Sequence, residues 1–192
     1  MKRPLLSLLA LAVFSPSCDG DEPPSCPTKE GVICTWAGDG EAGFNGDEEP
    51  LSEARFYWPV DVTITRSGEF YILDWNNHQV RHLQPDGTLK TVIGTDFVGD
   101  GPFDLSDLER PGAMGTAIHL NHPTQLLEEP GGTLLLVSWH NHKIRRYDPA
   151  TGRAYVLCGR GAGFAGDGGP VDDADARLNQ PSGGVIDGEG NL

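Results

Sequence analysis

The chain has 192 residues, with 28 acidic and 14 basic side chains, a formal net charge of −14, 26 glycines and 15 prolines. This balance argues against nucleic acid as a partner, because phosphate binding needs a basic surface. Glycine and proline at this density, with few apolar patterns of helical period, predict an all-β protein of short strands and turns.

The first 17 residues predict an export signal peptide. Lys2 and Arg3 give a positive start, residues 5–14 form a short apolar stretch, and Ser15 and Ser17 supply small residues at its end. An apolar stretch of about ten residues is too short for a membrane-spanning helix, which needs about 20. We therefore expect the protein to be exported.

The processing of this segment has two alternatives. Small residues before Cys18 suit ordinary signal peptidase and a secreted product, whereas a cysteine directly after them resembles a bacterial lipoprotein signal with Cys18 as the site of lipid attachment. Residues 18–31 are acidic and Pro-rich, which is typical of an unpacked tether. The tether favours a lipoprotein of the cell envelope that is held at the membrane by its lipid anchor only.

Three further cysteines are Cys26, Cys34 and Cys158. An exported protein meets an oxidising environment, so we expect one disulfide and one leftover thiol if Cys18 is acylated. Cys26 and Cys34 are the nearest pair in sequence, but the pairing of Cys158 with either of them stays open. The cysteine spacing is not that of zinc ligands.

An internal repeat organises residues 32–192. Pro59, Pro123 and Pro181 occupy the same place in three similar segments, 64 and 58 positions apart, and His78 and His142 share the offset of 64. Each copy predicts four short antiparallel strands, which form a propeller blade. The predicted strands are 60–64, 70–74, 78–83 and 89–93 in the first copy, and 133–138, 142–147 and 154–157 in the second.

The repeat predicts an all-β fold, a β-propeller of four-stranded antiparallel blades at about 56–94 and 120–158 with an incomplete one at 178–192. Residues 32–38 resemble a final strand without its predecessors. Propellers typically use 4 to 8 blades, so about two and a half blades predict an incomplete ring and a sequence truncated at its C-terminus. The connections, rich in glycine and aspartate, are where a propeller presents its ligand-facing surface; they are residues 38–55, 94–119 and 159–177.

Several ordered motifs resemble NHL repeats, a family of β-propeller repeats named for an Asn-His-Leu signature. The resemblance rests on residues 74–81, on the Gly-Phe-Xaa-Gly-Asp connections around Phe44 and Phe164, and on residues 176–181 and 187–192. Leu does not follow the signature histidine in either copy, and Ser138 stands where the first copy has an aspartate. The resemblance implies structural roles in the repeat for Asp74, Asn77, His78, Asn141 and His142.

Three other histidines, His119, His122 and His140, have no counterpart in the first copy. Some NHL-type propellers resemble lyases that use metal ions in the central channel, so the resemblance implies a His-lined metal site as an alternative. The acidic loop residues lack the spaced ligands of a calcium site. We expect no cofactor, with calcium or zinc as the alternative, and assign no metal-binding residue. No catalytic residue is assigned either, since no nucleophile motif is present.

The sequence thus favours an exported, non-enzymatic binding module that presents propeller loops to a protein, peptide or glycan ligand. This prediction depends on the fold and on the lack of a catalytic set of residues. The alternative is a metal-dependent propeller enzyme, a lyase or a lactonase-like hydrolase, whose site would lie mostly in missing blades.

Overall fold

The computed structural model describes residue 27 and residues 29–192. The chain divides into two compact units, one ending at Thr35 and the other spanning Trp36–Leu192. The predictions for the signal segment, Cys18 and Cys26 lie outside the described residues. Within the described part, no helix is long and apolar enough to cross a membrane.

Two of the cysteines lie in the described part of the chain. Cys34 is disulfide-bonded, whereas Cys158 is a half-buried free thiol. These two cysteines therefore do not pair with each other.

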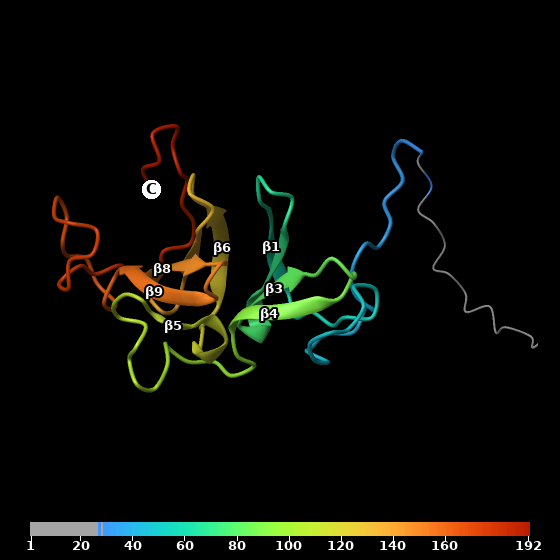
Figure 1. Cartoon of the computed structure of the whole chain (residues 1–192), viewed down its shortest axis with the longest axis horizontal. Coiled ribbons are helices and arrows are strands. Elements are labelled where there is room, and N and C mark those ends of the chain that lie inside the picture. The colour runs from blue at the N-terminus through green and yellow to red at the C-terminus, as the bar shows by residue number, and fades with distance from the viewer. Residues whose placement is uncertain (1–26, 28) are drawn as a thin grey trace, which may run out of the picture. The chain divides into compact units, whose positions relative to one another are not determined.

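The first copy of the repeat forms an antiparallel four-stranded sheet, which we call blade 1 (Figure 1). Its strands follow one another in chain order and are β1 (Pro59–Ile64), β2 (Phe70–Asp74), β3 (Gln79–Leu83) and β4 (Leu89–Gly94). A single turn of 3-10 helix, η1 (Trp75–Asn77), joins β2 to β3 where an asparagine turn was predicted. The four predicted strands of this copy are confirmed to within a residue or two at their ends.

The second copy forms a five-stranded sheet, which we call blade 2. Four strands match the repeat: β6 (Pro123–Glu128), β7 (Leu134–Ser138), β8 (Lys143–Asp148) and β9 (Arg153–Cys158). The fifth, β5 (Ala113–Met114), pairs with β9 at the outer edge and leads into the short helix η2 (Gly115–Ala117). Two residues are too few to carry a strand periodicity, so the sequence did not reveal β5.

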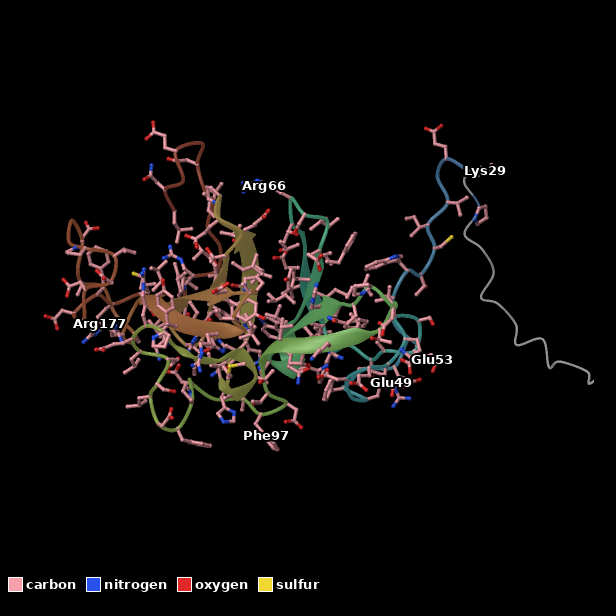
Figure 2. The ribbon with its side chains drawn as sticks, viewed as in Figure 1. Lys29, Glu49, Glu53, Arg66, Phe97 and Arg177 are labelled. Carbon is pink, nitrogen blue, oxygen red and sulfur yellow. The ribbon has the colours of Figure 1, made fainter. Side chains whose placement is uncertain are left out.

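The turn between the first two strands recurs in all three copies. In each, an N–H at the start of the turn donates to a carbonyl four residues later, and the fourth residue is a glycine with φ between 84° and 89°. These hydrogen bonds are Thr65–Glu69 at 2.9 Å, Glu129–Thr133 at 2.8 Å and Asp187–Asn191 at 2.9 Å. Figure 2 shows Arg66 at the tip of this turn in blade 1. Residues 178–192, the third copy, therefore keep the turn although they form no strand.

Residues 32–38, predicted as a final strand, also form no strand. A strand depends on a neighbouring strand for its hydrogen bonds, and an apolar pattern alone supplies none. The N–H of Gly38 donates instead to the carbonyl of Leu51, in the loop that leads to blade 1, at 2.9 Å. Without a neighbouring strand, residues 32–38 thus form none in this chain, and the final strand stays a prediction.

Blades 1 and 2 pack face to face, with β1 beside β6 (Figure 1). Their shared core is mainly apolar and almost fully buried, and each buried Val, Leu or Ile side chain in it contributes about 1.5–3 kcal/mol when removed from water. The core contains Tyr71, Leu73, Val80 and Ile93 from blade 1 and Leu126, Leu134, Leu136, Tyr147 and Ala154 from blade 2. The two blades together with the third copy form part of a β-propeller, without a closed ring.

A polar contact repeats where one copy meets the next. Asp61 of β1 accepts the N–H of Leu126 at 2.9 Å, and Gln125, at the equivalent place in β6, accepts the N–H of Gly184 at 2.7 Å. Asp61 and Gln125 stand 64 positions apart in the sequence. The third copy thus contacts blade 2 as blade 2 contacts blade 1.

Each blade buries one arginine at the same repeat position. Arg145 of β8 donates to Asp100 at 2.9 Å and to Asp107 at 3.3 Å, and the Asp107 side chain is 1 % exposed. Arg81 of β3 donates from Nη2 to Asp47 at 3.2 Å and to a loop carbonyl. The Nε and Nη1 of Arg81 are buried without a hydrogen-bond partner among the described residues.

Candidate functional site

The β2–β3 turn and the segment before β1 meet at one end of blade 1, because β1 and β2 are antiparallel and Pro59 pairs with Asp74. The N–H of Asn76 donates to the carbonyl of Tyr57 at 3.0 Å. In blade 2 the N–H of His140 donates to the carbonyl of Asn121 at 3.3 Å. The repeat therefore brings the same two segments together in both blades.

Six rings from these segments form a connected layer that we call the aromatic surface. It consists of Tyr57, Trp58, Trp75, His122, Trp139 and His140. The ring centroids of Trp58 and Trp75 lie 5.9 Å apart, and those of Trp75 and Trp139 lie 6.2 Å apart. Trp58 is 65 % exposed, and the other two tryptophans are half-buried. The surface thus runs from the start of blade 1 across to blade 2.

His122 lies in the middle of the aromatic surface. Its ring centroid is 4.2 Å from that of Trp75, and its Nδ1 lies 2.6 Å from Oδ1 of Asn121 and 3.1 Å from Nδ1 of His140. Its Nε2 lies 3.3 Å from Oδ1 of Asn76. Burial, and then the neighbouring His140, lower the pKa of His122. The centre of the surface is therefore polar but uncharged near neutral pH.

The two signature histidines each contact the next copy of the repeat. Nδ1 of His78 accepts the backbone N–H of His122 at 3.2 Å, and Nδ1 of His142 accepts that of Gln180 at 3.1 Å. His122 and Gln180 both precede a proline and both have a positive φ. Burial, and to a lesser degree His122, lower the pKa of His78 to about 4. The ring of His78 is therefore neutral, which leaves Nδ1 free to accept.

The other signature residues hold the segments before β1 and β6. Oδ1 of Asp74 accepts the N–H of Tyr57 at 2.8 Å, and its Oδ2 accepts a hydrogen bond from Asn77 at 2.8 Å. In blade 2, Oδ1 of Asn141 accepts the N–H of Asn121 at 2.9 Å, so Asn141 makes the contact that Asp74 makes in blade 1. Burial raises the pKa of Asp74 to about 6. All three side chains lie beneath the surface.

The histidines considered as metal ligands are only partly brought together. His122 and His140 are adjacent, whereas His119 lies apart, with its Nδ1 2.8 Å from the hydroxyl of Thr95. In the described part of the chain, no three His, Cys, Asp or Glu side chains have an arrangement that could hold a metal ion. The metal-dependent alternative stays a prediction.

Sequence reasoning did not predict the aromatic surface. A signal was present, because Trp75 and Trp139 lie 64 positions apart and each directly follows the second strand of its blade. The exposed Trp58 and the histidine His122 both stand directly before a repeat proline. What the sequence did not show is that these two sets of residues become neighbours.

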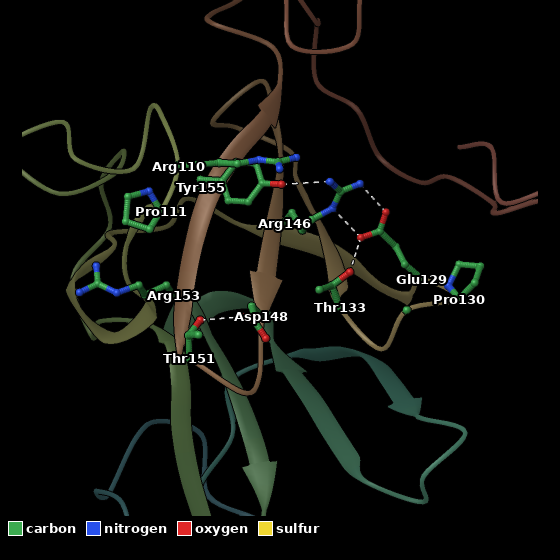
Figure 3. Close-up of a pocket in the computed structure, with 11 residues that line it drawn as sticks. Arg110, Pro111, Glu129, Pro130, Thr133, Arg146, Asp148, Thr151, Arg153 and Tyr155 are labelled. Carbon is green, nitrogen blue, oxygen red and sulfur yellow. Dashed lines mark hydrogen bonds and ion pairs between the residues drawn. The ribbon is translucent and has the colours of Figure 1, made fainter.

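A hollow of about 730 Å³ lies elsewhere, against β8 and β9 of blade 2 (Figure 3). Figure 3 shows Arg146 donating to both carboxylate oxygens of Glu129 and to Tyr155 beside it. Arg146 corresponds in the repeat to His82, and the face of blade 1 that carries His82 is turned toward blade 2, where Tyr147 and Pro149 lie close by. In blade 1 the equivalent face therefore lies against the neighbouring blade.

Comparison with known proteins identifies the repeat. The family model of the NHL repeat matches residues 56–83, the segment that contains β1 to β3 and the first signature. The chain contains an NHL repeat. The same pattern of contacts extends from this segment into the second and third copies.

Two further proteins resemble a larger part of the chain. The Arabidopsis thaliana protein SUPPRESSOR OF QUENCHING 1, chloroplastic, is 29% identical over 168 residues, which is 85% of this chain but 15% of that protein. The crystal structure of an auxiliary nutrient binding protein from Bacteroides thetaiotaomicron VPI-5482 has a TM-score of 0.51 at 23% identity, and covers 67% of this chain and 32% of that one. The chain thus spans less than a third of the length of either relative. The second likeness shows the fold alone.

Proposed function

We propose that this NHL-repeat chain is an exported binding module whose aromatic surface holds a protein, peptide or glycan ligand. The observation that carries the proposal is the connected row of Trp58, Trp75 and Trp139 across two blades. Large connected apolar groups on a protein surface mark interaction sites, and tryptophan and tyrosine are enriched among the residues that dominate binding energy.

The residues beneath the rings support this proposal. The Asp74 and Asn141 side chains fix the backbone of the two segments that carry Trp58 and His122. A binding surface held in place before the ligand arrives loses less entropy on binding. The Bacteroides structure is described as a nutrient binding protein, and a binding role for this chain agrees with that description.

The proposal includes lipid attachment at Cys18. The disulfide at Cys34 supports export, because disulfides persist in oxidising compartments. Expression of the full chain in a bacterial host with labelled palmitate should label the wild-type protein and not Cys18→Ala. Equal labelling of both would contradict the anchor.

Binding at the aromatic surface is tested with the full chain against arrays of hexapeptides and of plant, chitin and bacterial oligosaccharides, followed by calorimetry on the ligands that bind. We expect Trp139→Ala to weaken binding at least tenfold. Trp36→Ala is the matched control, because Trp36 is 52 % exposed and lies outside the aromatic surface.

Circular dichroism must show that both variants keep their β structure, and Trp139→Phe, which retains a ring, should recover most of the affinity. The proposal is wrong if no ligand class binds, or if ligands bind Trp139→Ala as tightly as the wild-type chain.

A further inference from the structure

A small hollow adjoins the aromatic surface at its blade 1 end. Its volume is about 220 Å³, and it is lined by the rings of Phe56 and Trp58, by Glu41, and by small residues of the loop before blade 1. Trp58 belongs both to the hollow and to the aromatic surface, since it contacts Trp75. The hollow is therefore a side pocket of the proposed binding surface.

The lining of this hollow suits a positive charge. Glu41 is exposed and is the one charged residue among the lining residues, none of which is basic. The nearby guanidinium of Arg55 is already held by Asp39 at 2.8 Å. The face of a tryptophan ring attracts a cation, and the net charge of −14 attracts basic ligands to the whole chain.

The size of the hollow limits what it can take. Pockets for whole small molecules usually measure about 300–1,000 Å³, so this hollow fits a single side-chain head group better than a sugar chain. The backbone that shapes it is fixed, because the carbonyl of Phe56 accepts the N–H of Gly43 at 3.2 Å and the N–H of Tyr57 donates to Asp74 at 2.8 Å.

We propose that this hollow receives a Lys or Arg side chain of a peptide ligand whose remaining residues lie along the aromatic surface. The inference rests on the proposed function and narrows its ligand to a basic peptide. Glu41 pairs with the cationic head group, and the aromatic rings of Phe56 and Trp58, which line the same hollow, attract it further.

The test uses the full chain and two synthetic hexapeptides that differ at one position. At that position one peptide has lysine and the other has norleucine, its uncharged analogue. In both peptides a phenylalanine stands next to this position. We expect the lysine peptide to bind more tightly and to weaken about 2- to 5-fold in Glu41→Gln, as expected for an exposed charge pair. The norleucine peptide should be unaffected by this variant. Glu53→Gln is the matched control, because Glu53 is exposed on the same loop but does not line the hollow (Figure 2).

Trp58→Leu should weaken the lysine peptide about 2- to 5-fold more than Trp58→Phe does, because only a ring retains the cation contact. Phe164→Leu, which removes an exposed ring elsewhere, should change nothing. Raising the salt concentration should weaken the lysine peptide and spare the norleucine peptide.

Three outcomes overturn the inference. Equal binding of the two peptides removes the cation subsite, yet leaves the proposed function intact if Trp139→Ala still weakens both. If tetramethylammonium or choline binds as tightly as the lysine peptide, the ligand is a small organic cation and not a peptide. Cellohexaose binding more tightly than either peptide, with no response to Glu41→Gln, makes the ligand a glycan.

Discussion

Blades 1 and 2 reach the same backbone geometry with different side chains. In blade 1 the N–H of Tyr57 is accepted by Asp74, whereas in blade 2 the equivalent N–H of Asn121 is accepted by Asn141. Ser138, which replaces the aspartate, has a buried hydroxyl with no hydrogen-bond partner among the described residues. The difference teaches that the repeat requires an acceptor at this place, and that a neighbouring signature residue can supply it.

The two buried arginines differ in the carboxylates with which they pair. Arg145 neutralises Asp107, which is almost fully buried. The partner of Arg81 is Asp47, whose side chain is 37 % exposed and also accepts hydrogen bonds from the N–H and hydroxyl of Thr91. Arg145 therefore pairs directly with a buried carboxylate, whereas Arg81 pairs directly with a partly exposed one and stabilises the charge of the buried Asp74 without a hydrogen bond between the two side chains.

Replacing these arginines should give the largest difference between the blades. We expect Arg145→Met to destabilise the chain by about 3–5 kcal/mol, because it leaves Asp107 buried without a counter-charge. Arg81→Met should cost less than Arg145→Met, since it removes two nitrogens that have no hydrogen-bond partner among the described residues, leaves Asp47 hydrogen-bonded, and takes from Asp74 only a charge that makes no hydrogen bond to it. Urea unfolding followed by circular dichroism measures both.

The double variant Arg145→Met with Asp107→Leu is the control. It should recover much of the stability lost in Arg145→Met alone, because the buried carboxylate of Asp107 is then removed together with its partner. Equal losses of stability in Arg81→Met and Arg145→Met would show that the two arginines do not differ in how much the stability of the chain depends on them.

A second prediction concerns pH, where blade 1 contains two groups that act in opposite directions. The pKa of His78 falls from an ordinary 6.5 to about 4, so its contribution to stability is full above pH 6.5 and is lost as the pH falls through about 4. The pKa of Asp74 rises from 3.8 to about 6, so its contribution is full below pH 3.8 and is lost as the pH rises through about 6.

Between pH 7 and 4.5, His78→Asn should therefore gain stability relative to the wild-type chain on acidification, by about 1–2 kcal/mol. Asp74→Asn should change relative to the wild-type chain in the opposite sense. Unfolding midpoints at half-unit pH steps provide the measurement, and parallel pH profiles for the wild-type chain and both variants would contradict the assignment.

The smallest expected effect tests the hydroxyl that blade 2 does not use. Ser138→Ala should change stability by less than about 0.5 kcal/mol, because the hydroxyl has no hydrogen-bond partner among the described residues and its removal leaves none of them unsatisfied. In blade 1, Thr65→Val should cost about 1 kcal/mol, since the Thr65 hydroxyl accepts the N–H of Glu69 at 3.0 Å. Differential scanning calorimetry resolves the two, and a larger loss for Ser138→Ala would mean that its hydroxyl has a partner.

Most of the fold could be predicted because the pattern of each strand occurs in more than one copy of the repeat. Period-two alternation and the turn glycines located the strands of blade 1 to within a residue or two. Residues 32–38, which resemble a final strand, form none in this chain, and β5 was not predicted, because a strand depends on a pairing partner that local periodicity does not identify.

The candidate site was less predictable. The family resemblance predicts structural roles in the repeat for Asp74, His78 and His142. Each of these side chains contacts a segment before a repeat proline, and the roles themselves stay predictions. The aromatic surface was missed because Trp58 and Trp75 are 17 positions apart, and Trp75 and Trp139 are 64 apart.

The sequence by itself determined the repeat, its strands and its turns, because these depend on neighbouring residues and on the conformational freedom of glycine and asparagine. Only the tertiary structure decided which side chains from different copies meet. Antiparallel pairing places Trp58 beside Trp75, and blade packing places His122 against both His78 and Trp75. The proposed binding surface therefore arises between blades and belongs to no single copy of the repeat.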